Sequence, residues 1–216
     1  MGSLLEMGGP MIGKEYCLPC TARYKIKHSG EKVALENKWD ICDENKVVVF
    51  QAIKERPNPN APNSSWSFKY ETRVQDFEGK LVTRFKFKGN KWEVFDGESD
   101  DIICVIKEDK GDLKVFRNSN LKKMDPDYKT HLRKNFGLFS PWDLVIRHGT
   151  TPLAEVLKND SWFHLKEYIV AVNEGADVAF VTLLILMMDD MESMFSTINA
   201  ASFSFFNYNY RSAWPF

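Results

Sequence analysis

The sequence predicts a mainly β protein whose strands close into a barrel around one apolar helix near the C-terminal end. Short segments of alternating or β-branched residues recur about every ten residues from residue 24 onward, separated by glycine-containing turns, which is typical of barrels and sandwiches. Residues 178–188 break this pattern because only Thr182 among them is polar, which favours a helix. A helix that is apolar on all sides must be buried on all sides, and a closed barrel is the simplest surrounding for it.

The composition excludes several classes of protein. Hydrophobic residues make up 44% of the 216 residues, which predicts a compact core and excludes global disorder. The 29 Lys and Arg residues against 30 Asp and Glu leave a net charge of -1, which argues against a polybasic nucleic-acid binder. We therefore expect no binding of nucleic acid, and any anion-binding site must be a local patch. We also expect the protein to be a monomer.

The domain boundaries follow from changes in this pattern. Residues 1–15 contain four glycines and a proline without periodicity, which predicts a flexible N-terminal arm. Residues 16–195 are expected to form the barrel domain, with its central helix at about 175–192. Residues 196–216 are expected to be an aromatic C-terminal tail.

Within the barrel domain, the first strands are expected from Tyr24 and in a strand–turn–strand unit at 39–50. Residues 55–65 contain three prolines, which predicts a surface loop. A polar connection is expected around 118–130. The later strands are expected at 66–74, 81–88, 91–95, 101–107, 113–117, 136–139, 142–147, 153–157 and 162–172.

An ordered set of short motifs carries a family resemblance. The motifs are Tyr16-Cys17-Leu18-Pro19, the hairpin sequence at 39–45, Ala154-Glu155-Val156, and residues 168–172 followed by Gly175-Ala176-Asp177 before the apolar helix. In this order and spacing they resemble the LURP-one-related family, which is similar to the tubby C-terminal-like superfamily that includes the phospholipid scramblases. The resemblance covers residues 16–192 and implies a twelve-stranded antiparallel barrel around a central C-terminal helix.

A basic strand is the most informative patch for function. Period-two geometry directs Phe85 and Phe87 inward and Arg84, Lys86 and Lys88 outward together. Neighbouring cations widen this candidate anion-binding face, namely Lys69, Arg73 and Lys91. Because tubby-like barrels present basic residues to phosphoinositide head groups, the resemblance implies an anionic-lipid surface here. The alternative is a solvated strand face whose charge is balanced by acids such as Glu71.

The C-terminal tail is a second candidate binding element. Seven aromatic residues occur in residues 203–216. Its candidate partner-binding residues are Phe206, Tyr208, Tyr210 and Trp214. Three interpretations remain open, namely an added strand on the barrel, an exposed peptide that docks a protein partner, and an interfacial membrane anchor.

The remaining reactive residues do not form a catalytic or metal-binding motif. Cys17 and Cys20 have CxxC spacing but lack a second pair, and no secretory leader opens the sequence, so we expect reduced thiols that bind no metal. The four histidines match no catalytic motif and no phosphate-binding glycine loop is present. Asp189 and Asp190 are too few for a calcium site and are expected where the helix meets water.

The sequence thus predicts a non-enzymatic binding or scaffold module without a cofactor. Its expected location is the cytoplasm, with peripheral association at membranes through anionic phospholipid head groups. One alternative function is a protein-partner scaffold that uses the aromatic tail. The other is an enzyme with an unrecognised pocket.

Overall fold

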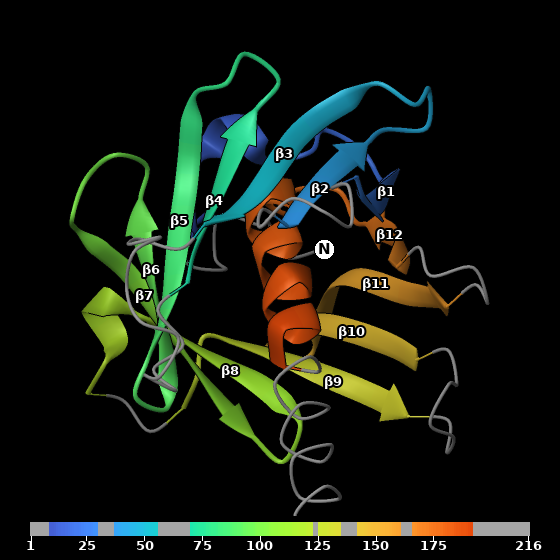
Figure 1. The fold of residues 1–216 in the computed structure, drawn as a ribbon. Coiled ribbons are helices and arrows are strands. Elements are labelled where there is room, and N and C mark those ends of the chain that lie inside the picture. The colour runs from blue at the N-terminus through green and yellow to red at the C-terminus, as the bar shows by residue number, and fades with distance from the viewer. Residues whose placement is uncertain are drawn as a thin grey trace, which may run out of the picture. The chain divides into compact units, whose positions relative to one another are not determined.

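The computed structural model describes residues 9–29, 37–55, 70–122, 125–134, 142–160 and 166–191. Twelve antiparallel strands form one closed barrel, in which each strand pairs with its neighbours in the chain and β1 pairs with β12 (Figure 1). The strands are β1 (Ala22–His28), β2 (Asn37–Cys42), β3 (Val48–Glu55), β4 (Glu71–Asp76), β5 (Leu81–Lys88), β6 (Lys91–Asp96), β7 (Ile102–Asp109), β8 (Asp112–Arg117), β9 (Tyr128–Lys134), β10 (Trp142–His148), β11 (Thr151–Asp160) and β12 (Lys166–Val172). The predicted fold class is confirmed.

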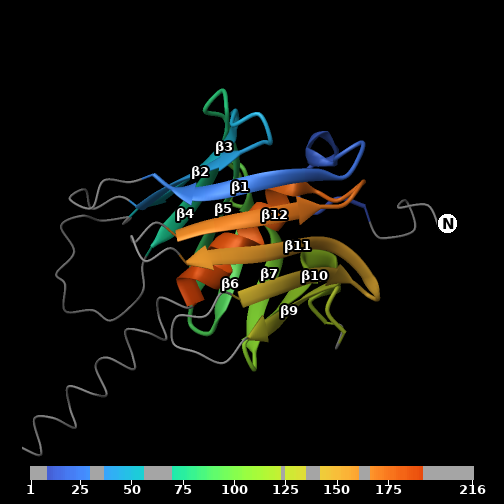
Figure 2. The ribbon, with the colours of Figure 1, turned by 90° about the vertical axis from the view of Figure 1, so that its right-hand side faces the viewer.

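The barrel wall follows the period-two pattern read from the sequence. On β5 and β6, the buried residues Phe85 and Val94 face each other across the pair, and the next pair on this face joins Phe87 to Trp92. Residues between them point to the outer side of the barrel. The outer face therefore carries most of the charged strand residues, with the buried Lys158 of β11 as an exception, and Figure 2 shows the strands β9–β12 and β1 that complete the barrel.

One strand lies where the sequence analysis expects a polar connection. The strand β9 begins at Tyr128, inside the expected connection at 118–130, while the strand expected at 136–139 lies outside the described residues. Thr130 is a buried member of β9, and its hydroxyl oxygen accepts a hydrogen bond from the Leu113 backbone N–H at 2.7 Å. A buried hydrogen-bonded threonine replaces the apolar residue that a strand pattern requires, which is why the hydrophobic pattern misses β9.

The described part of the N-terminal segment differs from the flexible arm expected for residues 1–15. Met11 is buried, and the backbone N–H groups of Ile12 and Gly13 donate to the Asp177 carboxylate. A short 3-10 helix, η2 (Lys14–Tyr16), follows, and Cys17 forms an antiparallel bridge with Asp177. Residues 12, 13 and 17 are therefore fixed by contacts with Asp177, which lies 160 or more positions away in the chain, and local glycine content cannot reveal such contacts.

The chain contains two compact units, residues 1–182 and 183–216. The first unit holds the barrel, and a helix begins in it at residue 178, with Asp177 as its N-cap. The helix continues to residue 191 in the second unit, where the described residues end. Every side chain from 178 to 191 is at most 8% exposed, as expected for a helix that is apolar on all sides.

The two acids near the end of this helix are a correction to the sequence analysis. Asp189 and Asp190 are expected at the point where the helix meets water, but both are buried. Each has an interaction partner, so neither is an isolated buried charge. An acidic pair after an apolar run is therefore not sufficient to locate the end of a buried helix.

Candidate functional site

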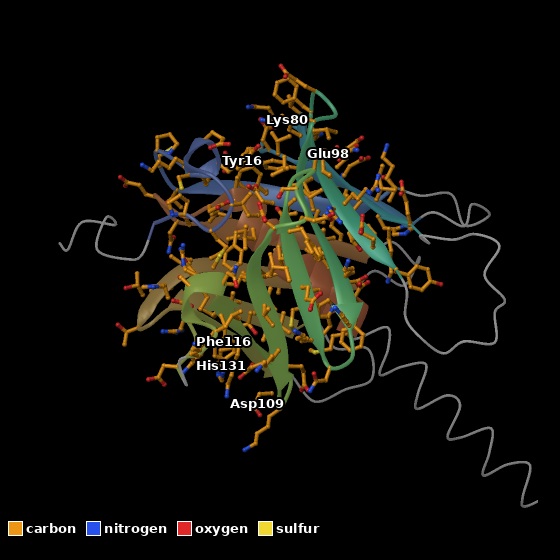
Figure 3. All side chains as sticks on the ribbon, turned by 90° about the vertical axis from the view of Figure 1, so that its left-hand side faces the viewer. Tyr16, Lys80, Glu98, Asp109, Phe116 and His131 are labelled. Atoms are coloured by element: carbon orange, nitrogen blue, oxygen red, sulfur yellow. The ribbon has the colours of Figure 1, made fainter. Side chains whose placement is uncertain are left out.

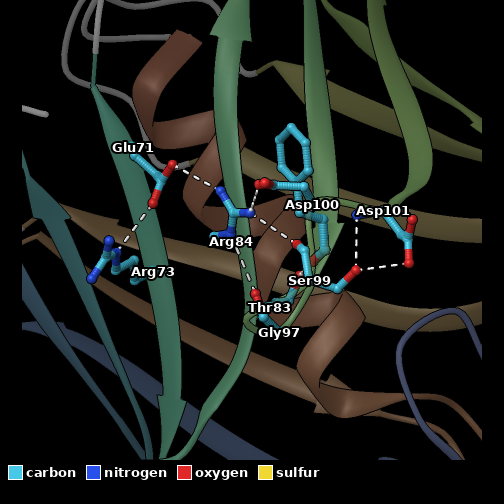
Figure 4. A network of polar contacts seen from close by, with 9 residues as sticks. Glu71, Arg73, Thr83, Arg84, Gly97, Ser99, Asp100 and Asp101 are labelled. Atoms are coloured by element: carbon cyan, nitrogen blue, oxygen red, sulfur yellow. Dashed lines mark hydrogen bonds and ion pairs between the residues drawn. The ribbon is translucent and has the colours of Figure 1, made fainter.

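Arg84 is the central residue of the basic face predicted on β5, and it lies in a network of acceptors (Figure 4). Its guanidinium donates to the Glu71 carboxylate at 3.2 Å, to the Asp100 carboxylate at 2.5 Å and to the Ser99 carbonyl at 2.9 Å. It also lies over the Phe95 ring, 4.6 Å from the centroid. Burial alone lowers the pKa of Arg84, but the bonds to Asp100 and Glu71 outweigh burial and raise it.

The fixed position of Arg84 depends on the turn between β6 and β7. The Gly97 carbonyl accepts from Arg84 Nε at 3.3 Å. Gly97 has a φ of +44°, and a Cβ atom there would lie 3.2 Å from the Leu81 carbonyl oxygen, so glycine allows this turn to close on β5. With only 11% of its side chain exposed, Arg84 is a structural residue that joins β4, β5 and the turn.

The other members of the predicted face are also next to acids or rings. Arg73 pairs with Glu71 at 3.1 Å and Glu55 at 3.8 Å, while the Lys86 ammonium lies 4.5 Å from the Phe95 centroid. Lys88 and Lys91 share Glu93, at 3.6 and 3.1 Å. Four carboxylates thus pair with four of the five described cations of this face. Lys69 and the tail residues Phe206, Tyr208, Tyr210 and Trp214 lie outside the described residues.

A second group of cations shares Lys88 and Lys91 with the predicted face, and its full extent becomes visible only when the strand register is known. Residues paired directly across neighbouring strands from β5 to β10 are all basic, and we name this group the cation row: Lys88, Lys91, Lys107, Lys114, Lys129 and Arg147. Each lies next to an inward-facing residue, which is Phe87 for Lys88 and a buried residue such as Trp92, Ile106 or Ile146 for the others. By strand alternation all six side chains therefore project from the outer face of the barrel.

The cation row is only partly neutralised. Glu93 pairs with Lys88 and Lys91, and Asp109 pairs with Lys114. Within the part of the chain that the structure describes, the remaining three members, Lys107, Lys129 and Arg147, form no ion pair. Six cations thus face two paired carboxylates, which leaves an excess of four positive charges before more distant groups are counted.

The lysines of the cation row that have no acid partner in the described ranges are exposed to solvent. The Lys107 ammonium lies 5.3 Å from the Phe116 ring centroid, and Lys107 and Lys129 are both exposed. Figure 3 shows Phe116, His131 and Asp109 on this side of the barrel, toward the end opposite Lys80 and Glu98. Asp112, next to the row, faces His131 at 3.7 Å.

Glu93 is the acid that most strongly moderates the row. Its side chain is only 6% exposed, so burial raises its pKa, but the neighbouring Lys91 and Lys88 outweigh burial and hold the pKa below its ordinary value. Glu93 is therefore ionised at neutral pH and reduces the positive charge at the β5–β6 end of the row.

The other candidate residues show no clustered chemistry in the described part of the chain. All four cysteines are free thiols, and no group of three His, Cys, Asp or Glu side chains among the described residues is arranged to hold a metal ion. Burial raises the pKa of the Cys17 and Cys104 thiols, which makes both poor nucleophiles at neutral pH.

Comparisons with known proteins agree with this architecture. A solved X-ray structure of a protein from Arabidopsis thaliana is similar to this chain, with a TM-score of 0.60 and 22% sequence identity, over 86% of this chain and 99% of that one. No curated protein matches the chain significantly. None of the described helices is both long enough and apolar enough to span a membrane. The family model for LURP-one-related proteins matches residues 25–189, and the chain belongs to this family.

Proposed function

We propose that this protein is a non-catalytic binding module that works in the cytoplasm and associates peripherally with membranes rich in anionic phospholipids, including phosphoinositides. The observation that supports this proposal is the cation row, in which six directly paired positions on six neighbouring strands are basic. Adjacent strands lie about 4.8 Å apart, so these charges are closely spaced on the outer surface. Lipid phosphates are the acceptors that such a dense row of cations attracts.

The expected affinity is modest because the row curves with the barrel wall. A flat membrane meets only a few neighbouring strands at once, and each Lys or Arg near an anionic surface contributes about 1 kcal/mol. The lysines without acid partners among the described residues, Lys107 and Lys129, are exposed and contribute most because their charges are not already compensated. Since these charges are solvent-exposed, added salt weakens the association.

The positions of the histidines are consistent with the non-catalytic part of the proposal. The His28 ring contacts Trp39, the His148 ring contacts Tyr128, and His131 is exposed beside Asp112 on the outer face. In the described ranges, no serine or cysteine side chain is hydrogen-bonded to any of these three rings. A general base without a nearby nucleophile does not form a hydrolytic triad.

Vesicle co-sedimentation tests the membrane proposal. The full chain is mixed with phosphatidylcholine vesicles, alone or with added phosphatidylserine or phosphatidylinositol 4,5-bisphosphate, at low and high salt. The double variant Lys107→Gln/Lys129→Gln should bind anionic vesicles about 30-fold more weakly, since two contributions of about 1 kcal/mol are lost. Its melting temperature should not change because both side chains are exposed.

A matched control variant removes two positive charges from lysines outside the cation row. Lys27 on β1 and Lys80 in the turn before β5 are exposed and lie outside the row. The variant Lys27→Gln/Lys80→Gln should therefore bind like the parent chain. Equal weakening by the two double variants, or a parent chain that ignores anionic vesicles at low salt, would refute the role of the cation row.

A further inference from the structure

The N-terminal strap, residues 9–13, is fixed to the barrel on one side by Arg117. The Arg117 guanidinium donates to the backbone carbonyl of Gly9, to that of Pro10 at 3.3 Å and to the Tyr128 hydroxyl oxygen at 2.7 Å. Arg117 also lies over the Tyr128 ring, 5.6 Å from the centroid. One side chain at the end of β8 therefore joins the strap to the first residue of β9.

Asp177 fixes the other side of the strap. Its carboxylate accepts from the backbone N–H groups of Ile12 at 2.7 Å and Gly13 at 3.2 Å, and from Phe180 N–H at 3.0 Å in the first turn of the helix. Burial raises the pKa of Asp177, while these backbone bonds oppose the rise. Because the carboxylate oxygens already accept three backbone hydrogen bonds, Asp177 has a structural role and is not available to bind a ligand.

A cavity of about 300 Å³ lies beneath this strap. Its lining is mainly apolar and includes Met11, Tyr128, His148, Leu153, Ala176 and Phe180. The Tyr128 ring forms an aromatic wall, with its centroid 5.0 Å from that of His148 and 4.9 Å from that of Phe180. This volume is at the lower end of the range for small-molecule sites, and an apolar lining with few polar groups is their usual character.

Lys14 and His148 are the basic side chains of the cavity, and Asp177 is its acidic one. Lys14 lines it from the 3-10 helix η2, and within the described residues it has no ion pair. The His148 imidazole is the other lining group that can donate to a ligand. Because backbone N–H groups already bind the Asp177 carboxylate, Lys14 is the charged side chain left to pair with the head of a ligand, beside an apolar cavity body.

We propose that this cavity binds a small amphipathic anion, a molecule with an apolar body and a single carboxylate-type head. The body lies against Tyr128, Leu153 and Phe180, and the head pairs with Lys14. This site is independent of the proposed membrane surface because no lining residue belongs to the cation row.

Isothermal titration calorimetry of the full chain with octanoate, octanol and octylamine tests the head-group preference. The three probes share one apolar tail, so their affinities differ only through the head. Octanoate should bind about tenfold more tightly than octanol, which is the contribution expected of one charge-assisted hydrogen bond, and octylamine should bind most weakly. The variant Lys14→Gln should reduce octanoate affinity about tenfold and leave octanol affinity unchanged.

Two controls separate this cavity from other basic surfaces. Lys80→Gln removes an exposed lysine outside the cavity, and Lys107→Gln/Lys129→Gln removes the uncompensated lysines of the cation row. Both variants should bind octanoate like the parent chain. Loss of octanoate binding in either control, or equal binding of octanoate and octanol to the parent, would overturn the proposal whatever the vesicle experiments show.

A filled cavity provides a second test. Ala176 is buried in the lining, and Ala176→Leu adds three methylene-sized groups to the space. We expect this variant to lose binding of both octanoate and octanol while it keeps a cooperative melting transition. Parent-like binding in the folded variant places the ligand elsewhere and overturns the proposal. If Ala176→Leu does not fold, the result with Lys14→Gln decides alone.

Discussion

Two outer faces of the same barrel carry cations, and although they meet at Lys88 and Lys91, they differ elsewhere in what lies beside those cations. On the face predicted from sequence, Arg73 and Arg84 are directly paired across β4 and β5 and share the Glu71 carboxylate. Along the cation row, Lys107 and Lys129 flank Lys114 across β7, β8 and β9, and neither has an acid partner in the described part of the chain. The first face is nearly neutral and largely structural, while the second keeps a positive field.

The difference shows that a count of basic residues along one strand does not measure the charge of a surface. Arg84 looks available in the sequence because its strand neighbours Lys86 and Lys88 point the same way. In the folded chain, the half-buried Glu71 of the neighbouring strand binds its guanidinium, and Asp100 and the Ser99 carbonyl bind it from a turn about 16 residues away, so its charge is already compensated. Cations that can still attract an external anion are found where basic residues of neighbouring strands are aligned and no acidic side chain lies beside them.

The largest effect expected from this comparison is the loss of stability in Arg84→Gln. The change removes the donor of the Ser99 and Gly97 carbonyls and one of the two arginines that bind Glu71, so we expect the free energy of unfolding to fall by about 2 to 3 kcal/mol. Urea denaturation measures this loss. At a temperature where the variant is folded, its binding to anionic vesicles should equal that of the parent chain.

The exposed Lys88→Gln is the control for Arg84→Gln, because 68% of the Lys88 side chain is exposed and its stability contribution should be under about 0.5 kcal/mol. A stability loss as small in Arg84→Gln as in Lys88→Gln would contradict the structural role of the guanidinium. The contacts of Arg84 would then contribute no more to the free energy of unfolding than those of an exposed lysine.

A smaller effect is expected from Glu93→Gln, which removes the acid shared by Lys88 and Lys91. The change raises the net charge of the row by one, so vesicle affinity should increase about fivefold, in line with about 1 kcal/mol per charge near an anionic membrane. Co-sedimentation at low salt measures the increase. Glu155→Gln on β11 is the control, since it changes the same charge outside the row and should leave affinity unchanged. Equal gains in both variants would mean that net charge and not the row controls binding.

Part of the cation row was accessible from the sequence. The turn Gly89-Asn90 connects β5 directly to β6, and such a two-residue turn fixes the pair Lys88 and Lys91. The turn Lys110-Gly111 fixes Lys107 opposite Lys114 in the same way. The signal in each strand is a cation next to an inward-facing apolar residue, as in Phe87-Lys88, Ile106-Lys107 and Lys114-Val115.

The register between strands of different hairpins could not be predicted from the sequence, because it depends on a bulge and on a long connection. Lys91 faces Lys107 only because the register between β6 and β7 shifts at Val94 and Phe95, and a one-residue change would place Lys91 beside an inward-facing residue. Lys114 faces Lys129 across a longer connection that is not a tight hairpin. The twelve-stranded barrel and its apolar helix follow from local patterns, whereas the alignment of charges between hairpins is a property of the closed barrel.

The smallest predicted effect is a pH dependence caused by Glu93. Its pKa in the folded chain lies below the ordinary value of 4.5, because Lys91 and Lys88 favour the ionised form more than burial disfavours it. The folded state therefore gains stability from this carboxylate at pH values above about 4.5, and loses that gain as the pH falls through the lowered folded pKa. The difference in unfolding free energy between the parent and Glu93→Gln should accordingly be constant from about pH 6 to 7 and shrink in acid. Urea denaturation of both proteins, from about pH 7 down into the acid range below the ordinary Glu pKa, measures the difference. A gap that widens in acid would mean that burial dominates at Glu93, and that the lysines at this end of the row are less closely paired with it than the distances indicate.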